Sequence, residues 1–403
     1  MRRFVAQALI VTGLFFAVCW FAASPAPADG FHPRLSIALN VVDYRFFIKK
    51  CLAEEWPYRP VTIAAHDACY PPIAYCLVKC FPPTSRGEAV YVAALVVGLL
   101  AGFVFFLMQR QRQDLLLCIG AVALTVPFAS GPIKGNPSAW AAGALFVFLA
   151  WYDAEAMWKR CVAAVALAFA ASLKITPVLY GLLYLRGRLF DPEKWPKEEI
   201  FVAAFSFAVL FAVPFVFFGG PNEVNAWLRN AIENSRHYSQ GADFGLVPVI
   251  GLLARRIPLL TLGFAVQMTT AVAVVFGVSS CFARQFHHAL TLLGVAMAFL
   301  CHHDYGLVYL LPAFASWVGA PRQEGKSRWV GDVVLLVESA LWFLVFESVL
   351  CVHSSRAIEI SNMVCNWAVV ALGVISLATV VAVALRGCAQ GTSSRLDESE
   401  FGK

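Results

Sequence analysis

Charged residues are scarce in this chain: Asp, Glu, Lys and Arg make up 14% of its 403 residues, whereas hydrophobic residues make up 60%. The sequence also lacks a long polar block in which a soluble domain could fold. Apolar runs of the length that a membrane span requires, about 20 residues, recur instead from one end to the other. The composition therefore excludes an ordinary soluble protein and predicts a single all-α polytopic membrane domain.

Two ligand-binding signatures are missing as well. The twelve cysteines include no CxxC pair, which argues against zinc and iron–sulfur sites. The net charge of +6 has no basic tract with interleaved aromatics behind it, so no nucleic acid partner is expected. Four cysteines do gather in one polar loop, at positions Cys51, Cys69, Cys76 and Cys80. Disulfides and free thiols are both compatible with that spacing.

The apolar segments predict about twelve crossings, with both termini in the cytoplasm. The first helix, residues 4–23, looks like a signal peptide but is expected to be retained, because further apolar segments follow at once. Residues 24–86 form a large external loop that contains a short interfacial helix at 70–81. Residues 1–386 are thus expected to form one membrane domain, and residues 387–403 a polar cytoplasmic tail.

Polar residues interrupt the apolar pattern at two places. Lys174 separates residues 161–173 from residues 175–185, which fits either one kinked span or a hairpin with Lys174 at a recessed apex. A lysine in mid-membrane costs roughly 2.5–3.5 kcal/mol on insertion scales, so we favour the hairpin. His302 and His303 divide a second pair of short arms in the same way. Two such apices on one side predict a polar cavity cut into the external side of the membrane.

Six short motifs follow one another along the external side of this topology. They are, in chain order, Asp43-Tyr44, Trp56-Pro57-Tyr58, Tyr70-Pro71-Pro72, Gly135-Asn136, Leu173-Lys174-Ile175-Thr176-Pro177, and His302-His303-Asp304-Tyr305 with Pro312. Their order and placement resemble the GT-C glycosyltransferases, most closely those of family 87, over nearly the whole chain. That family includes polyprenyl-phosphate-mannose-dependent mannosyltransferases, and GPI mannosyltransferase I is a more distant likeness.

The resemblance implies a GT-C fold and the inverting transfer of a sugar, with mannose as the best-known case. The sugar would pass from a polyprenyl-phosphate-sugar donor to a hydroxyl of a lipid or glycan acceptor, on the extracytoplasmic face of the plasma membrane. The expected partners are the donor, the acceptor and the lipid bilayer, and no cofactor is implied beyond the donor as co-substrate. Asp43 lacks the second acid of the Asp-X-Asp form found in some GT-C members, so no metal ligand is named and a divalent metal stays open.

The resemblance also assigns roles to residues. Asp43 corresponds to the loop acid of the family and is the expected catalytic base, with Asp67 as its substitute. Cationic or hydrogen-bonding groups are expected at the donor phosphate, namely Lys174, His302, His303 and Arg45. Other candidates are expected to contact the sugar or the acceptor, namely Tyr58, Tyr70, Asn136, Arg236 and His237.

Each of these residues also has a purely structural interpretation. Asp43 could pair with a nearby cation, Lys174 could be a snorkelling lysine, and aromatic side chains are common at the membrane interface. Glu338, inside an apolar segment, is expected to pair with a neighbouring helix. The rival function is that of a lipid or sugar transporter or flippase without transferase activity. Transporters commonly contain internal repeats, and the two halves of this chain show none.

Overall fold

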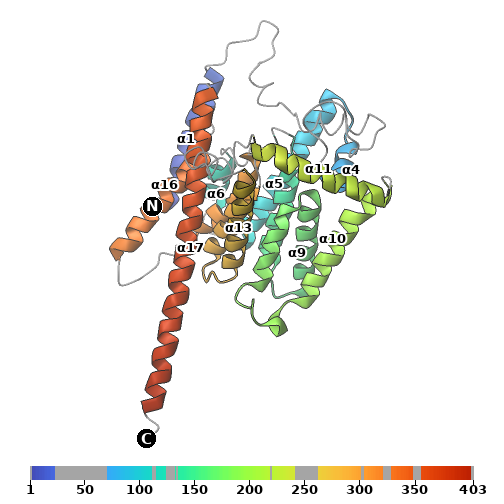
Figure 1. The fold of residues 1–403 in the computed structure, drawn as a ribbon. Coiled ribbons are helices and arrows are strands. Elements are labelled where there is room, and N and C mark those ends of the chain that lie inside the picture. The colour runs from blue at the N-terminus through green and yellow to red at the C-terminus, as the bar shows by residue number, and fades with distance from the viewer. Residues whose placement is uncertain are drawn as a thin grey trace.

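A computed structural model describes residues 2–22, 70–110, 115–123, 132, 135–217, 220–240, 262–300, 304–320, 328–347 and 355–400. Every regular element within these ranges is a helix, as Figure 1 shows. The all-helical class expected from the sequence is thus confirmed for the described part of the chain. The expected base, Asp43, and most of the external loop at 24–86 lie outside it.

The helices follow the order of the predicted segments. They are α1 (Arg2–Ala22), α4 (Pro72–Lys79), α5 (Ser85–Arg110), α6 (Leu115–Ala123), α8 (Ser138–Trp151), α9 (Met157–Leu173), η1 (Thr176–Leu185), η2 (Pro192–Lys194), α10 (Lys197–Phe217), α11 (Pro221–Gln240), α13 (Leu262–Ser280), α14 (Phe286–Leu300), η3 (Asp304–Leu310), α15 (Leu311–Val318), α16 (Arg328–Glu347) and α17 (Ser355–Glu400). The three η elements are 3₁₀ helices. The polar segment after residue 386 is not separate from α17, which continues as a helix to Glu400 and extends beyond the bundle in Figure 1.

Three of the described helices are long and apolar enough to cross a membrane. They are Arg86–Arg110 in α5, Lys197–Val216 in α10 and Met363–Arg386 in α17. Five further apolar helices among the described residues are shorter. The number of about twelve crossings therefore stays a prediction.

The exposed side chains of α10 indicate whether water or lipid surrounds this side of the bundle. Its exposed apolar side chains recur every four residues, at Phe201, Phe205, Val209 and Val213, and so form one stripe along the helix. A stripe of this length would be costly in water but is stable against lipid chains. The exposed face of α10 is therefore its lipid-facing side.

Helices α5 and α8 approach each other closely through glycines. A Cβ atom added to Gly102 would lie 2.3 Å from the carbonyl oxygen of Gly143, and one added to Gly143 would lie 2.5 Å from that of Gly98. Trp140 on α8 donates a hydrogen bond of 3.0 Å to the carbonyl oxygen of Ala94 on α5. Small residues allow such close backbone contact between membrane helices, and here they fix the start of α8 against α5.

The segment around Lys174 is a hairpin, as the sequence analysis favoured. Helix α9 ends at Leu173 because the ring of Pro177 is incompatible with the carbonyl group four residues earlier, and Lys174 adopts an extended conformation. The chain then returns as η1 beside α9: a Cβ atom on Gly181 would lie 3.4 Å from Leu167. The second arm is a ten-residue 3₁₀ helix, which is long for this helix type.

A second hairpin, formed by α14 followed by η3 and α15, packs against the first. The second arm of the first hairpin is η1, and the second arm of the other hairpin begins with η3. The buried hydroxyl of Tyr180 donates a hydrogen bond of 2.7 Å to the carbonyl oxygen of Tyr309. The second arms of the two hairpins are thus joined directly.

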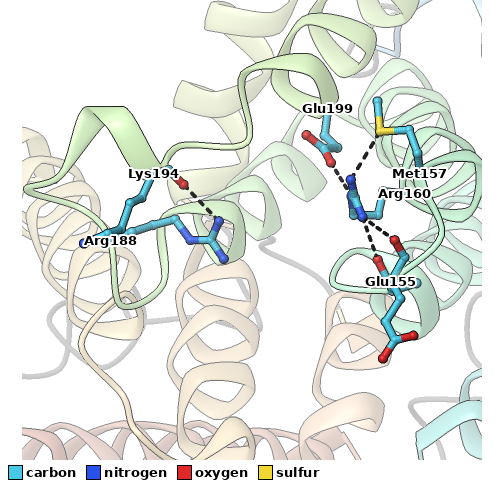
Figure 2. Close-up of polar contacts among 7 residues, drawn as sticks. Glu155, Met157, Arg160, Arg188, Lys194 and Glu199 are labelled. Atoms are coloured by element: carbon cyan, nitrogen blue, oxygen red, sulfur yellow. Dashed lines mark hydrogen bonds and ion pairs between the residues drawn. The ribbon is translucent and has the colours of Figure 1, made fainter.

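A polar network, drawn in Figure 2, joins α9 to α10. It lies at the amino end of α9, whereas Lys174 follows the carboxyl end. Arg160 forms an ion pair with the buried carboxylate of Glu199. Its guanidinium also donates to the carbonyl oxygens of Ala154 and Glu155, at 3.0 Å and 2.7 Å. These bonds hold the base of the hairpin.

Glu338 also has a partner on a neighbouring helix. Its carboxylate accepts a hydrogen bond of 2.8 Å from the indole of Trp317 on α15, so the expected pairing is confirmed.

Candidate active site

Three segments that are far apart in the sequence meet at the carboxyl end of α9. The predicted topology places this end on the external side of the membrane. Tyr70 lies just before α4, Asn136 and Ser138 lie at the start of α8, and Lys174 follows the end of α9. Their polar side chains form one hydrogen-bonded chain in the order Tyr70, Asn136, Ser138, Lys174. The structure thus brings three of the sequence-predicted site residues together and adds Ser138, which the sequence analysis did not name.

The start of α8 is built by four consecutive residues. Gly135 has a positive φ of 70°, which favours glycine, and the hydroxyl of Tyr91 on α5 donates a 3.1 Å bond to its carbonyl oxygen. Asn136 then accepts a hydrogen bond of 2.9 Å on its Oδ1 atom from the backbone N–H of Ser138. This bond to the residue two positions later forms an Asx turn, which leads the chain into α8 through its N-cap residue Pro137.

The orientation of the Asn136 amide follows from that backbone bond. A backbone N–H can only donate, so the atom of Asn136 that faces it must be the oxygen. The hydroxyl of Ser138 donates to the same oxygen at 2.5 Å. The Nδ2 atom therefore faces the other way, where it donates a 2.7 Å bond to the hydroxyl oxygen of Tyr70. Asn136 is buried, so this geometry is held by its surroundings.

Lys174 determines which groups donate and which accept in the rest of this chain of hydrogen bonds. Its half-buried ammonium lies 3.2 Å from the hydroxyl oxygen of Ser138, and an ammonium can only donate. Ser138 must therefore accept from Lys174 and pass its own hydrogen to Asn136. The amino end of α8 also carries the positive end of the helix dipole. A lysine charge beside a helix amino end makes this point electropositive, as binding of an anion requires.

Helix α4 is held over the same end of the bundle by aromatic contacts. Phe81, just after α4, packs edge-on against Tyr91 with ring centroids 5.2 Å apart, and Tyr91 packs in the same way against Trp140 at 5.3 Å. Residues of α4 also contact α9 and α10. The expected interfacial helix at 70–81 is thus present as α4, with Pro72 in its first turn, and it carries Tyr70 to the site.

The cysteines of this region are free where the structure describes them. Cys76 and Cys80 lie on and just after α4, and the Cys80 thiol lies 3.5 Å from the carbonyl oxygen of Cys76. Burial raises the pKa of the Cys76 thiol, and nearby Lys79 opposes that shift. Cys51 and Cys69 lie outside the described residues, so the proposed disulfides with them stay predictions.

The other predicted site residues are not part of this described cluster. Most lie outside the described residues, namely Asp43, Arg45, Tyr58, Asp67, His302 and His303. Arg236 and His237 belong to α11, which lies across the bundle beside α10 and α13 in Figure 1, but their side chains are outside the description. Within the described residues no three His, Cys, Asp or Glu side chains are grouped so that they could hold a metal ion.

The described part of the chain is thus all-helical, with helices apolar enough to cross a membrane, and the Lys174 ammonium lies beside the amino end of α8. The model for glycosyltransferase family 87 matches residues 68–303, which is more than half of the chain. The chain therefore belongs to glycosyltransferase family 87, and the protein is a membrane glycosyltransferase. The matched range contains Tyr70, Asn136, Ser138 and Lys174, whereas Asp43 precedes it. Comparison with curated proteins gives no match.

Proposed function

We propose that this protein is an inverting glycosyltransferase that moves a sugar, mannose in our proposal, from a polyprenyl-phosphate-sugar to a hydroxyl of a lipid or glycan acceptor. The reaction takes place on the extracytoplasmic face of the plasma membrane. Family membership supports the glycosyl transfer itself. The choice of a phosphate-linked donor depends on the chemistry of the site.

The observation that carries the proposal is the position of Lys174. Its ammonium is held at the apex of a hairpin, half-buried and hydrogen-bonded to Ser138 at the amino end of α8. A phosphate oxygen placed there gains a charge-assisted hydrogen bond from the ammonium and a favourable interaction with the helix dipole. In the reaction this phosphate is the leaving group, so the same contacts stabilise the negative charge that develops on it.

The chemical step needs a base in addition to this anion site. The acceptor oxygen attacks the anomeric carbon from the face opposite the phosphate, while its proton passes to the carboxylate of Asp43. The bond between the anomeric carbon and the phosphate oxygen breaks, and its electron pair stays on the polyprenyl phosphate. Arg45, His302 and His303 are proposed to contact that phosphate, and Tyr58, Arg236 and His237 the sugar or acceptor.

The proposal is tested by incubating the purified protein with radiolabelled polyprenyl-phosphate-sugars and total cell lipids, and by identifying the labelled products. A new glycolipid or glycan with inverted anomeric configuration is the expected result. In reconstituted vesicles, movement of the intact donor across the bilayer without any labelled product would contradict the proposal and favour the transporter. Lys174→Ala serves as the matched variant, since it removes the ammonium at a half-buried position.

A further inference from the structure

Ser138 lies between the two polar groups that would meet a phosphate. Its hydroxyl accepts from Lys174 at 3.2 Å and donates to Asn136 at 2.5 Å, while its backbone N–H donates to Asn136 at 2.9 Å. The residue is fully buried, on α8, whose start is fixed against α5 by close glycine contacts. The Ser138 side chain therefore bonds both the ammonium and the amide.

We propose that Ser138 is a positioning residue of the donor site, which holds the Lys174 ammonium and the Asn136 amide as a single array of hydrogen-bond donors for a phosphate monoester or diester. The proposal rests on the proposed function, since it concerns the same anion site. Its physical basis is the direction of the hydrogen bonds: the Lys174 ammonium donates to the Ser138 hydroxyl, and the hydroxyl and the backbone N–H of Ser138 both donate to the amide oxygen of Asn136. The Asn136 nitrogen is then the end that faces Tyr70.

This arrangement implies a preference for anions over neutral ligands. The groups whose hydrogens are directed by the chain are an ammonium and an amide N–H₂, which are donors only. Reversing the Asn136 amide would place its oxygen beside Tyr70 and its nitrogen beside the backbone N–H of Ser138. Two hydrogen-bond donors would then face each other, which is unfavourable. The backbone N–H of Ser138 thus prevents the amide reversal that would add a repulsive oxygen to the anion site, and the Ser138 hydroxyl links this fixed amide to the Lys174 ammonium.

The test uses farnesyl phosphate as a short polyprenyl phosphate and farnesol as the same lipid without the phosphate. Binding of each to the purified full-length protein in detergent is measured by titration calorimetry, which requires no transfer activity. Wild type is expected to prefer farnesyl phosphate. Ser138→Ala is expected to weaken farnesyl phosphate binding roughly three- to ten-fold, because one ordinary hydrogen bond at each neighbour is lost, and to leave farnesol binding unchanged.

Two further variants separate positioning from simple structural support. In a Lys174→Met background, Ser138→Ala is expected to have much less effect, because residues that act through one another are not additive. Asn136→Asp keeps the acceptor for both Ser138 bonds but replaces the amide nitrogen by a charged oxygen, so it is expected to weaken farnesyl phosphate binding at least ten-fold with little change in melting temperature. Asp is close in size to Asn, so the Asn136→Asp variant is expected to fold, and the test does not depend on a substitution that disturbs packing.

The outcomes distinguish the inference from the function on which it rests. If wild type prefers farnesyl phosphate but Ser138→Ala binds it equally well, or the losses in the double variant simply add, Ser138 is not a positioning residue and the donor site stands without it. If wild type shows no preference for farnesyl phosphate over farnesol, the anion site itself is wrong and this inference is overturned with it.

Discussion

Charged side chains that enter the apolar bundle have defined neighbours. The carboxylate of Glu199 is paired with Arg160, and that of Glu338 accepts a hydrogen bond from Trp317. The Lys174 ammonium donates to the Ser138 hydroxyl beside the amino end of α8. The first two arrangements satisfy carboxylates, as buried charges require. The third places an ammonium beside the positive end of a helix dipole, and at the residue scale it is the feature from which we propose an anionic ligand.

The pair Arg160–Glu199 predicts a stability effect that is independent of activity. Glu199→Leu leaves the Arg160 guanidinium partly buried without its carboxylate, and breaking a buried pair costs roughly 3–5 kcal/mol. Because the Arg160 side chain is 28% exposed, we expect the lower end of that range. The matched control is Lys194→Gln, which breaks an ion pair with Asp191 in which the lysine side chain is 74% exposed. Thermal unfolding in detergent should show a clear loss for Glu199→Leu and almost none for the control.

The proposed catalytic base, Asp43, leads to a second prediction at the residue scale. Asp43→Asn is expected to lower single-turnover transfer by roughly 10²–10⁴-fold, because Asn cannot accept the proton of the acceptor hydroxyl. Donor binding is expected to change little, since the substitution keeps the size of the side chain. Asp67→Asn, at matched protein level, is the control. Near-normal rates for Asp43→Asn together with a loss for Asp67→Asn would move the base to Asp67.

At the scale of elements, the site depends on how helices end and how closely they pack. The end of α9 is encoded by Pro177, and the start of α8 by the run Gly135-Asn136-Pro137, so both could be predicted from local sequence. The 3₁₀ geometry of η1 could not, because hydrophobic periodicity does not separate a 3₁₀ from an α-helix in a short apolar run. Its packing on η3 through Tyr180 supplies information that is absent from either segment alone.

The glycine contact between α5 and α8 predicts a loss of function far from the chemistry. Gly102→Val would place side-chain atoms into the backbone of Gly143, so α8 must move away and carry Asn136 and Ser138 with it. We expect reduced transfer and a lower melting temperature. Gly331→Val on α16 is the matched control, since a Cβ atom there meets nothing within 4 Å. Equal behaviour of the two variants would contradict the proposed role of the close contact.

At the scale of the whole molecule, the sequence predicted the helical class and the order of the segments, because apolar length and flanking charge are local properties. It also proposed Tyr70, Asn136 and Lys174 as site residues, and for Lys174 the cost of a lysine in mid-membrane added a physical argument to the resemblance. Their direct connection depends on Ser138, which is an ordinary serine in the sequence. An Asn-Pro-Ser run at a helix start was the available signal, because Asn there bonds to the residue two positions later. The convergence of segments about 40–100 residues apart has no local signal at all.

The hairpin also predicts the topology of the whole chain. Cys80 lies near the candidate site, and Lys194 follows η1 beyond the opposite end of the bundle. In cells that carry single-cysteine variants, an impermeant maleimide should label exposed Cys80 from outside. Lys194→Cys should be labelled only after the membrane is permeabilised. Labelling of both positions from the same side would contradict the orientation of the hairpin.

The measurement that tests the central claim most directly compares donor use by wild type and Lys174→Ala. Initial rates are measured against the concentration of the cognate polyprenyl-phosphate-sugar, at matched protein levels, with Lys159→Ala at the other end of α9 as the control. We predict that Lys174→Ala lowers kcat/KM for the donor by roughly ten- to 150-fold, the contribution of a charge-assisted hydrogen bond, while Lys159→Ala stays near wild type. An unchanged donor affinity and turnover in Lys174→Ala would contradict the account.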